Sequence, residues 1–187
     1  MEIVKTPIAG LIELTPRRFG DSRGWFSEVW NANVAAKAGV DVAFVQDNHS
    51  FSAAEGTVRG LHYQAPPHAQ AKLVRCGRGA VWDVAVDVRR NSPTYGQWYG
   101  TELSAENGRQ LFIPAGFLHG FSTLSENAEL LYKCSDFYAP DTDGSVLWNS
   151  AALGIDWKID AEPELSAKDA DAPDFAAWHS PFEWNPT

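Results

Sequence analysis

The sequence has few cysteines, a shortage of basic residues and no long apolar run, and each shortage argues against a class of protein. Cys76 and Cys134 are the only cysteines in 187 residues, which argues against a disulfide framework and favours a reducing compartment, the cytoplasm. The formal net charge of −9 argues against a nucleic-acid partner, which requires a broad basic surface. No segment approaches the length of a membrane-spanning helix, and the N-terminus lacks the features of a signal peptide. A small anionic ligand, which needs only a few converging cations, remains compatible with this composition.

The distribution of apolar residues predicts one all-β domain over residues 1–187. In VWDVAVDV (81–88), one Trp and three Val residues fall on one face of a strand, opposite Val, Asp, Ala and Asp. Many short strands at close spacing are typical of a β-sandwich or barrel. The same rhythm recurs at 44–51, 71–76, 109–114 and 129–138. Helix signals are confined to 31–39 and to a segment that begins near Ser166.

Two segments place a histidine in an apolar strand: GLHYQ at 60–64 and PAGFLHGF at 114–121. The second has the Pro-x-Gly-x-x-His spacing of cupin jelly rolls, whose metal sites usually add a His-x-His pair and a Glu. Here Gln64 replaces the second histidine of that pair, and Lys72 downstream would repel a divalent cation. The pattern therefore predicts the cupin fold without its metal.

His62 by itself has two explanations, because a lone histidine in a strand is more often a core residue than a catalyst. Its surroundings favour chemistry, since Gln46 and Asn48 share one face of a neighbouring strand and amides are costly to bury without partners. Strict alternation puts Arg59 on the opposite face from His62. Both can serve one pocket only if the strand breaks register near Gly60.

Two further residues also have structural and catalytic explanations. Tyr132 alternates with Leu130 and Cys134, so its side chain faces inward, which core packing explains as well as proton transfer does. Asp169 is the third residue after Ser166, the spacing of a helix capping box, and an aspartate there can act both as a cap and as a catalytic partner.

Several long motifs in order resemble the dTDP-4-dehydrorhamnose 3,5-epimerases, and the similarity spans nearly the whole chain. The matching motifs are RGWFSE (23–28), FVQDNHS (44–50), VRGLHYQ (58–64), AQAKLVRC (69–76), VWDVAVDVRRNSPTYGQW (81–98), LSAENGRQLFIPAGFLHGF (103–121), LLYK (130–133), GIDW (154–157) and LSAKDADAP (165–173). The resemblance implies a cupin-type jelly roll and a homodimer that exchanges strands. It also implies that the reaction needs neither a metal nor a redox cofactor.

The resemblance also implies four catalytic roles. The family's substrate is dTDP-4-dehydro-6-deoxy-D-glucose, whose C4 ketone acidifies the hydrogens on C3 and C5. His62 matches the base and Asp169 matches its dyad partner. Lys72 matches the residue that stabilises the enolate oxygen, and Tyr132 matches the proton donor.

The remaining matched positions are expected to bind the dTDP-sugar. Arg23 and Arg59 match the cations that hold the diphosphate, and Tyr138 matches an aromatic that stacks on thymine. Asp143 stands where many members carry Glu, so its direct contact with the ligand is in question. The other expected contacts are Phe26, Glu28, Gln46, Asn48, His119 and Lys168.

These inferences predict a cytoplasmic epimerase that inverts C3 and C5 in dTDP-L-rhamnose synthesis. One alternative is a relative that inverts only C3 or only C5, because it would use the same base and acid. Another alternative is a metal-dependent cupin enzyme, and a third is a catalytically silent cupin that binds sugar nucleotides.

Overall fold

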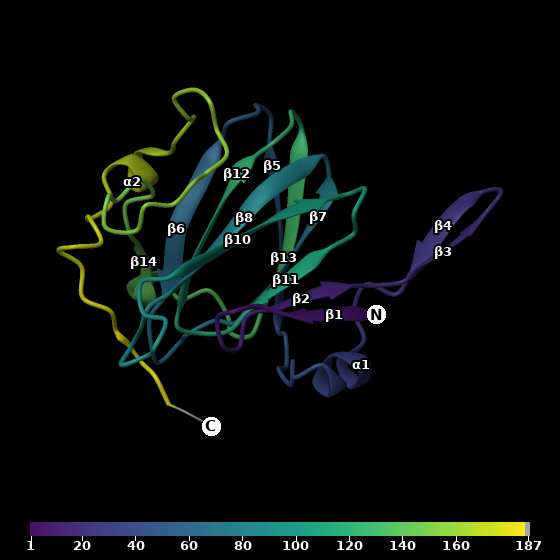
Figure 1. The fold of residues 1–187 in the computed structure, drawn as a ribbon, viewed down its shortest axis with the longest axis horizontal. Helices are drawn as coiled ribbons and strands as arrows, with labels where there is room; N and C mark the ends of the chain where they lie inside the picture. The colour runs from purple at the N-terminus through teal and green to yellow at the C-terminus, as the bar shows by residue number, and fades with distance from the viewer. Residues whose placement is uncertain (186–187) are drawn as a thin grey trace.

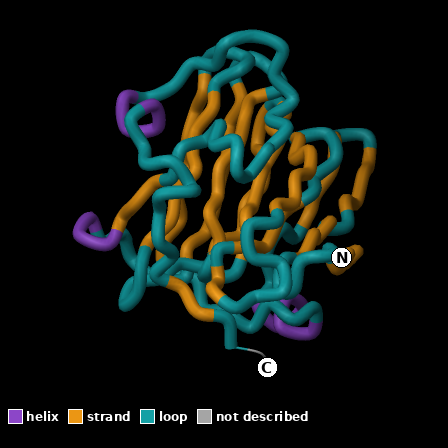
Figure 2. Tube along the Cα trace, turned by 60° about the vertical axis from the view of Figure 1, so that its left-hand side comes forward, coloured by secondary structure: helices purple, strands orange, loops and turns teal. Residues whose placement is uncertain are grey.

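Two antiparallel β-sheets pack face to face in the computed structural model, which describes residues 1–185 (Figure 1). The first sheet has six strands in the order β1 (Glu2–Lys5), β2 (Ile12–Thr15), β11 (Gln110–Ile113), β7 (Lys72–Arg78), β13 (Ala128–Cys134) and β5 (Gln46–Ser52). The second has five strands in the order β10 (Trp98–Ser104), β8 (Ala80–Asp87), β12 (Phe117–Thr123), β6 (Val58–Gln64) and β14 (Asp143–Ser145). Loops and the few helical turns lie around the sheets (Figure 2). The predicted all-β, cupin-type sandwich is confirmed, although the sheets do not close into a barrel.

Strand β8 shows why the middle of the sequence is so apolar, because both of its faces are covered. Val81 and Ala85 belong to the core between the two sheets, whereas Val84 and Val86 pack beneath the C-terminal segments on the other side. The two carboxylates of the strand, Asp83 and Asp87, alternate with Val81 and Ala85 and therefore point between the sheets. Both are fully buried.

The two α-helices are short, and each begins at a side-chain cap. The Asn31 side chain accepts the backbone N–H groups of Asn33 and Val34 at the start of α1 (Ala32–Lys37). Ser166 caps α2 (Ala167–Ala170), which ends after one turn, well before the end of the segment that carries its start signal. Pro173 explains the early end, because the residue before a proline is disfavoured in helical conformation. A 3-10 turn, η1 (Pro140–Thr142), precedes β14.

Two small ribbons lie outside the main sheets. The hairpin of β3 (Arg18–Asp21) and β4 (Gly24–Ser27) projects far from both sheets (Figure 1). Near the C-terminus, β15 (Phe182–Glu183) pairs in parallel with β9 (Arg89–Arg90). Most side chains of the β3–β4 hairpin are exposed, including Phe19, Trp25 and Phe26.

Candidate active site

Strand β6 changes register at Gly60, and this change brings Arg59 and His62 to one cavity. His62 faces His119 of β12, but the pairing then shifts, so that Arg59 faces Phe121. Gly60 has a φ of +136°, and a Cβ atom there would lie 2.6 Å from the Cα atom of Gly120. Only glycine fits this position. The register break that a pocket shared by Arg59 and His62 requires is therefore present.

The cavity formed at this break, here called the dyad cavity, has a volume of about 410 Å³. Its lining includes Arg59, His62, Leu165, Ser166, Lys168 and Asp169. Segments from both halves of the chain therefore meet there: β6 supplies the imidazole, and α2 with the residues before it closes the other side. A cavity of this size accommodates a small organic ligand.

His62 and Asp169 form a hydrogen-bonded pair at the cavity wall. The Nε2 atom of His62 lies 2.5 Å from Oδ1 of Asp169, whose side chain is only 4% exposed. Ser166 donates its hydroxyl to the other carboxylate oxygen at 2.9 Å and accepts the Asp169 backbone N–H. Burial acts to raise the pKa of Asp169, but the bonds from His62 and Ser166 outweigh it and hold that pKa below its usual value. Asp169 therefore both caps α2 and orients the imidazole, whose Nδ1 is left as the basic nitrogen.

Lys72 and Tyr132 project from the facing six-stranded sheet and do not line the dyad cavity directly. The Lys72 ammonium lies 5.9 Å from the centre of the Tyr132 ring, and Cys134 pairs with Lys72 across the ladder. Burial lowers the pKa of Lys72 and raises the pKa of Tyr132. The charge of Asp143 raises the pKa of Lys72 and the charge of Lys168 lowers it.

His119 belongs to a second histidine–carboxylate pair. Its Nε2 atom lies 2.8 Å from Oδ2 of Asp83, and both side chains are almost completely buried. Asp83 was not among the residues predicted from the sequence. Its signal was available, because a carboxylate between Val81 and Ala85 in an apolar strand is as unusual as the histidine of GLHYQ.

Two amides that the sequence placed on one face do lie together beside this centre. Gln46 donates to the Asn48 side-chain oxygen at 3.1 Å, and Asn48 donates to the Cys134 sulfur at 3.7 Å. The Gln46 oxygen accepts the backbone N–H of Tyr138 at 2.9 Å, which ties the loop after β13 to the strand. The predicted pair of amides therefore connects β5 to Cys134 and to the loop after β13 at one wall of the site.

Exposed polar groups gather at the mouth around Asp143. Lys168 donates to Oδ2 of Asp143 at 2.5 Å, and the Tyr138 hydroxyl lies 3.4 Å from the same oxygen. The shortened carboxylate at this position thus engages the two side chains that were expected to bind the ligand. Arg59 is held at the rim by the Ser52 hydroxyl and the Phe51 carbonyl.

Three expected ligand contacts lie elsewhere in the single chain. Arg23, Phe26 and Glu28 belong to the β3–β4 hairpin or follow it directly, and all are exposed. The hairpin extends away from β6 and α2 (Figure 1). Arg23 pairs only with its neighbour Asp21, at 2.5 Å, among the residues described. The chain on its own therefore does not bring these residues to His62.

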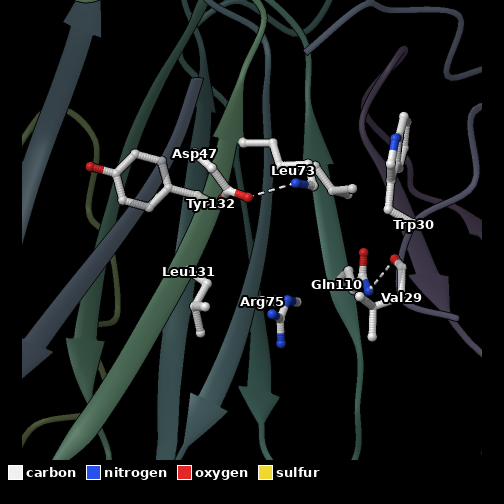
Figure 3. A pocket seen from close by; sticks show the side chains of 9 residues that line it. Val29, Trp30, Asp47, Leu73, Arg75, Gln110, Leu131 and Tyr132 are labelled. Atoms are coloured by element: carbon white, nitrogen blue, oxygen red, sulfur yellow. Dashed lines mark hydrogen bonds and ion pairs between the residues drawn. The ribbon is translucent and has the colours of Figure 1, made fainter. Parts of the chain in front are cut away.

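A different hollow lies over the six-stranded sheet next to Trp30 (Figure 3). It measures only about 60 Å³, and Gln110 donates there to the Val29 carbonyl at 2.9 Å. Its lining offers no histidine or cysteine as a base or nucleophile.

Within residues 1–185, no three or more His, Cys, Asp or Glu side chains gather in a way that could hold a metal ion. The same part of the chain contains no helix long and apolar enough to cross a membrane.

Comparison with known proteins identifies the family of this chain. A family model described as dTDP-4-dehydrorhamnose 3,5-epimerase matches residues 5–177. The enzyme of that name from Salmonella typhimurium is 55% identical over 174 residues, which cover 92% of this chain and 94% of that protein.

Two solved structures share the fold closely. A dTDP-6-deoxy-D-glucose-3,5-epimerase from Legionella pneumophila, in complex with dTDP-4-keto-L-rhamnose, is 45% identical, with a TM-score of 0.90 over 94% of this chain and 93% of that one. A 3′-monoepimerase from Streptomyces bikiniensis, in complex with dTDP-quinovose, is 38% identical, with a TM-score of 0.86 over 91% of this chain and 86% of that one. The chain therefore belongs to the dTDP-4-dehydrorhamnose 3,5-epimerase family.

Proposed function

We propose that the chain inverts C3 and C5 of dTDP-4-dehydro-6-deoxy-D-glucose to give dTDP-4-dehydro-L-rhamnose, in dTDP-L-rhamnose synthesis. The observation that carries this proposal is the hydrogen bond between His62 and Asp169 at the wall of a cavity rimmed by Arg59 and Lys168. An imidazole held in one tautomer by a buried carboxylate is suited to take a proton from carbon. The rim cations suit an anionic substrate. The Salmonella and Legionella relatives carry names for the same double epimerisation.

The residues divide the reaction into two proton transfers on either side of an enolate. The Nδ1 atom of His62 takes the proton from the carbon next to the C4 ketone, and the electron pair moves onto the C4 oxygen. The Lys72 ammonium stabilises that oxyanion. The Tyr132 hydroxyl then delivers a proton to the opposite face of the same carbon, which inverts it. The same two proton transfers then take place at the second carbon, after His62 and Tyr132 have exchanged their protons with solvent.

The nucleotide part of the substrate would lie along the mouth of the site. Arg59, at the rim of the cavity, would bind the diphosphate, and the exposed Tyr138 ring is suited to stack on thymine. Lys168, Gln46, Asn48 and His119 complete the expected contacts. Asp143 contributes by holding Lys168 and Tyr138 in place, which is supported by its two contacts with them.

Epimerisation in deuterated water tests this function. The purified protein is incubated with the 4-keto substrate, and label at C3 and C5 is followed by NMR. Label at both carbons together with the L-rhamno product is the expected result. A wild-type protein that incorporates no label would overturn the proposal.

Inversion at a single carbon is the second candidate, because the Streptomyces bikiniensis relative is named a 3′-monoepimerase. Its high structural similarity means that the same backbone supports either outcome. The labelling experiment separates the two functions, since a single-position enzyme would label and invert one carbon only.

We further propose that two copies form a homodimer in which the β3–β4 hairpin of each copy reaches the site of the other. Three observations support this arrangement: the hairpin projects from the sheets, its residues Trp25 and Phe26 are 59% and 69% exposed, and it carries the expected ligand contact Arg23. Arg23 and Arg59 lie apart within one chain. In such a dimer, Arg23 of the partner subunit would complete the diphosphate site beside Arg59. A cytoplasmic location, supported by the free thiols of both cysteines, completes the proposal.

Mixed dimers test the shared site. Arg23→Ala and His62→Asn homodimers are each expected to have little activity. Co-expression of the two variants should restore activity, because one site of the mixed dimer then combines an intact His62 with an intact Arg23. Failure of the mixed dimers to regain activity, or a monomer in light scattering, would overturn the shared site.

A further inference from the structure

The two buried carboxylates of β8 differ in how well they are compensated. Asp83 and Asp87 alternate along the inner face of the strand, and neither has any exposed surface. A carboxylate at such a position is costly unless each oxygen has partners, so the partners of each oxygen reveal what the residue does.

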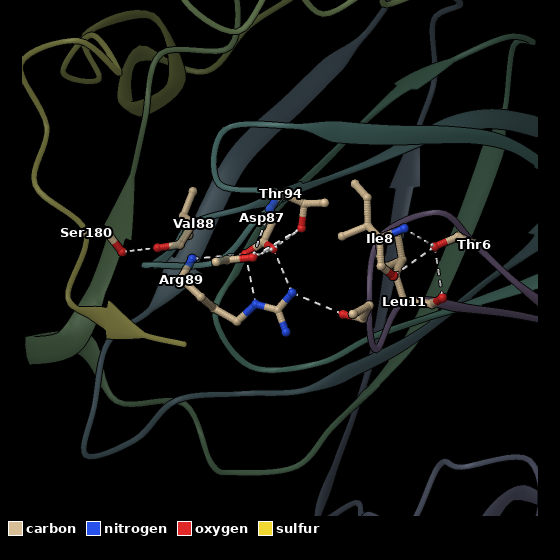
Figure 4. A network of polar contacts seen from close by, with 10 residues as sticks. Thr6, Ile8, Leu11, Asp87, Val88, Arg89, Thr94 and Ser180 are labelled. Carbon is tan, nitrogen blue, oxygen red and sulfur yellow. Dashed lines mark hydrogen bonds and ion pairs between the residues drawn. The ribbon is translucent and has the colours of Figure 1, made fainter. Parts of the chain in front are cut away.

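Asp87 has a complete structural explanation. Its oxygens accept two bonds from the Arg89 guanidinium, at 2.8 and 2.7 Å, and one hydroxyl bond each from Ser92 and Thr94 (Figure 4). The Arg89 guanidinium also binds the Ala9 carbonyl. Asp87 therefore joins the β8–β9 turn to the N-terminal loop, and its role is to stabilise the fold.

Asp83 is compensated on one side only. Its Oδ2 atom accepts a hydrogen bond from His119 at 2.8 Å, but its buried Oδ1 atom has no hydrogen-bond partner within residues 1–185. The neighbouring residues across the ladders are Thr101 of β10 and Phe121 of β12, and neither hydroxyl nor ring supplies a bond to it. A buried carboxylate oxygen without a hydrogen-bond partner does not stabilise the fold, so Asp83 needs a functional explanation.

The Asp83–His119 bond sets the state of an imidazole beside the base. His119 faces His62 directly in the β12–β6 ladder. Because each histidine donates from Nε2 to a carboxylate, each keeps Nδ1 as its free nitrogen. The site thus contains two histidines of the same tautomer side by side, each fixed by its own aspartate.

Asp83 and Lys72 both point into the space between the two sheets, because Lys72 alternates along β7 with Val74 and Cys76 of the core there. The groups that act on this ammonium from the surrounding elements are Cys134 of β13, Asp143 of β14, Asp83 of β8 and Lys168 of α2. Burial and Lys168 lower the pKa of Lys72, whereas the three acidic groups raise it. Asp143 already pairs with Lys168, and burial raises the pKa of the Cys134 thiol, so that it stays neutral. Asp83 is therefore the carboxylate among them whose charge no lysine or arginine within residues 1–185 neutralises directly.

We propose that Asp83 is a positioning residue of the epimerase site, which holds His119 in its Nε2–H tautomer and supplies a negative charge to the space between the sheets that Lys72 enters. It acts through these two side chains and does not itself touch the reacting carbons. The part that concerns turnover rests on the proposed function, whereas the part that concerns the tautomer of His119 does not.

The test compares Asp83→Asn with Asp87→Asn, which removes the same charge from the same strand at a purely structural position. Asp83→Asn should lower kcat by roughly 100-fold with a small change in KM, as for loss of one preorganised electrostatic group. In this variant, the pH at which kcat falls on the alkaline side (the alkaline limb) should be lower by about one unit or more. This is the size expected when an opposite charge near a lysine is removed. Asp87→Asn should lower thermal stability and leave the alkaline limb where it is in the wild type. An unmoved limb in Asp83→Asn would overturn the effect on Lys72.

Two further measurements separate the parts of the proposal. The ¹⁵N spectrum of the wild-type histidines should show His119 protonated at Nε2, and a proton on Nδ1 alone would overturn the assigned tautomer whether or not Asp83→Asn folds. His119→Gln leaves the Asp83 charge in place, so the alkaline limb of this variant should not move to lower pH. If the limb does move in His119→Gln, the shift cannot come from loss of the Asp83 charge, and Asp83 does not act on Lys72 by charge. A wild type that exchanges no substrate hydrogens would refute the proposed function, and the tautomer would still be readable.

Discussion

The imidazole of His62 and the carboxylate of Asp169 are joined by a 2.5 Å hydrogen bond, although 107 positions separate them in the sequence. Ser166 fixes the other oxygen of the same carboxylate. The pair therefore depends on α2 docking against β6, so that a helix of four residues controls the orientation of this imidazole.

His62→Asn is expected to abolish proton exchange at C3 and C5 while dTDP affinity changes by less than about tenfold, since the proposed base would contact the sugar and not the nucleotide. The measurement is deuterium incorporation together with calorimetric binding of dTDP. His49→Asn is the matched control, because His49 lies exposed beside Glu129 and should leave both properties unchanged. A collapse of dTDP affinity in His62→Asn would make this histidine structural.

Asp169→Asn should reduce kcat/KM by roughly 10³–10⁴-fold, because the amide no longer enforces the tautomer that leaves Nδ1 basic. Ser166→Ala removes the helix cap and one bond to the carboxylate, but leaves the bond to His62. We expect it to lower the free energy of unfolding by about 1 kcal/mol, with a far smaller kinetic effect. Steady-state kinetics and thermal denaturation measure the two effects. Equal kinetic losses in both variants would contradict a special role for the dyad.

Tyr132→Phe should slow formation of the epimerised product by about 100-fold, the typical contribution of a general acid. Because His62 remains intact, the variant should still exchange substrate hydrogens with solvent, and so release labelled substrate without inversion. NMR analysis of the recovered sugar distinguishes exchange from inversion. The control is Tyr99→Phe, whose hydroxyl binds Glu13 at 3.0 Å and should not affect either process. Normal inversion by Tyr132→Phe would return this residue to a packing role.

The rate should fall at alkaline pH because Lys72 loses its proton. Burial lowers the pKa of this lysine below its usual value of 10.5, so the charge proposed to stabilise the enolate is lost as pH rises through the lowered value. Burial raises the pKa of Tyr132, so this phenol keeps its proton to a higher pH than an exposed tyrosine does. In Lys72→Arg the cation stays charged across the range, and the alkaline limb should move upward at a reduced maximum rate. An unchanged limb in that variant would assign the titration to another group.

Gly60→Ala should destabilise the fold by more than about 2 kcal/mol, because the new methyl group meets the Gly120 backbone and alanine resists a positive φ. Activity should fall with it, since the register break at Gly60 brings Arg59 and His62 together. Gly56→Ala is the control: Gly56 also has a positive φ, of +77°, but a Cβ there meets nothing within 4 Å. We expect a cost of only about 1 kcal/mol for it. Chemical denaturation of both variants measures the difference.

The alternation of apolar residues was enough to predict the fold class and the side to which several residues point. Gln46 and Asn48 do share a face, Tyr132 does face inward, and Ser166 does cap a helix. These features depend on strand and helix periods, which act over a few residues and are visible in the chain itself. The family resemblance, based on motifs in the right order, was also confirmed.

Other features depend on segments far apart in the sequence, and only the tertiary structure decided them. Alternation alone separated Arg59 from His62, and the close approach of two backbones at Gly60 and Gly120 reverses that separation. The partner of His119 was not predicted, because Asp83 lies 36 positions away in another strand of the sheet. The sequence by itself determined which chemical groups are present and which way most of them face. The packing of the two sheets decided which groups meet, because contacts between distant segments follow from the pairing of strands and not from local periodicity.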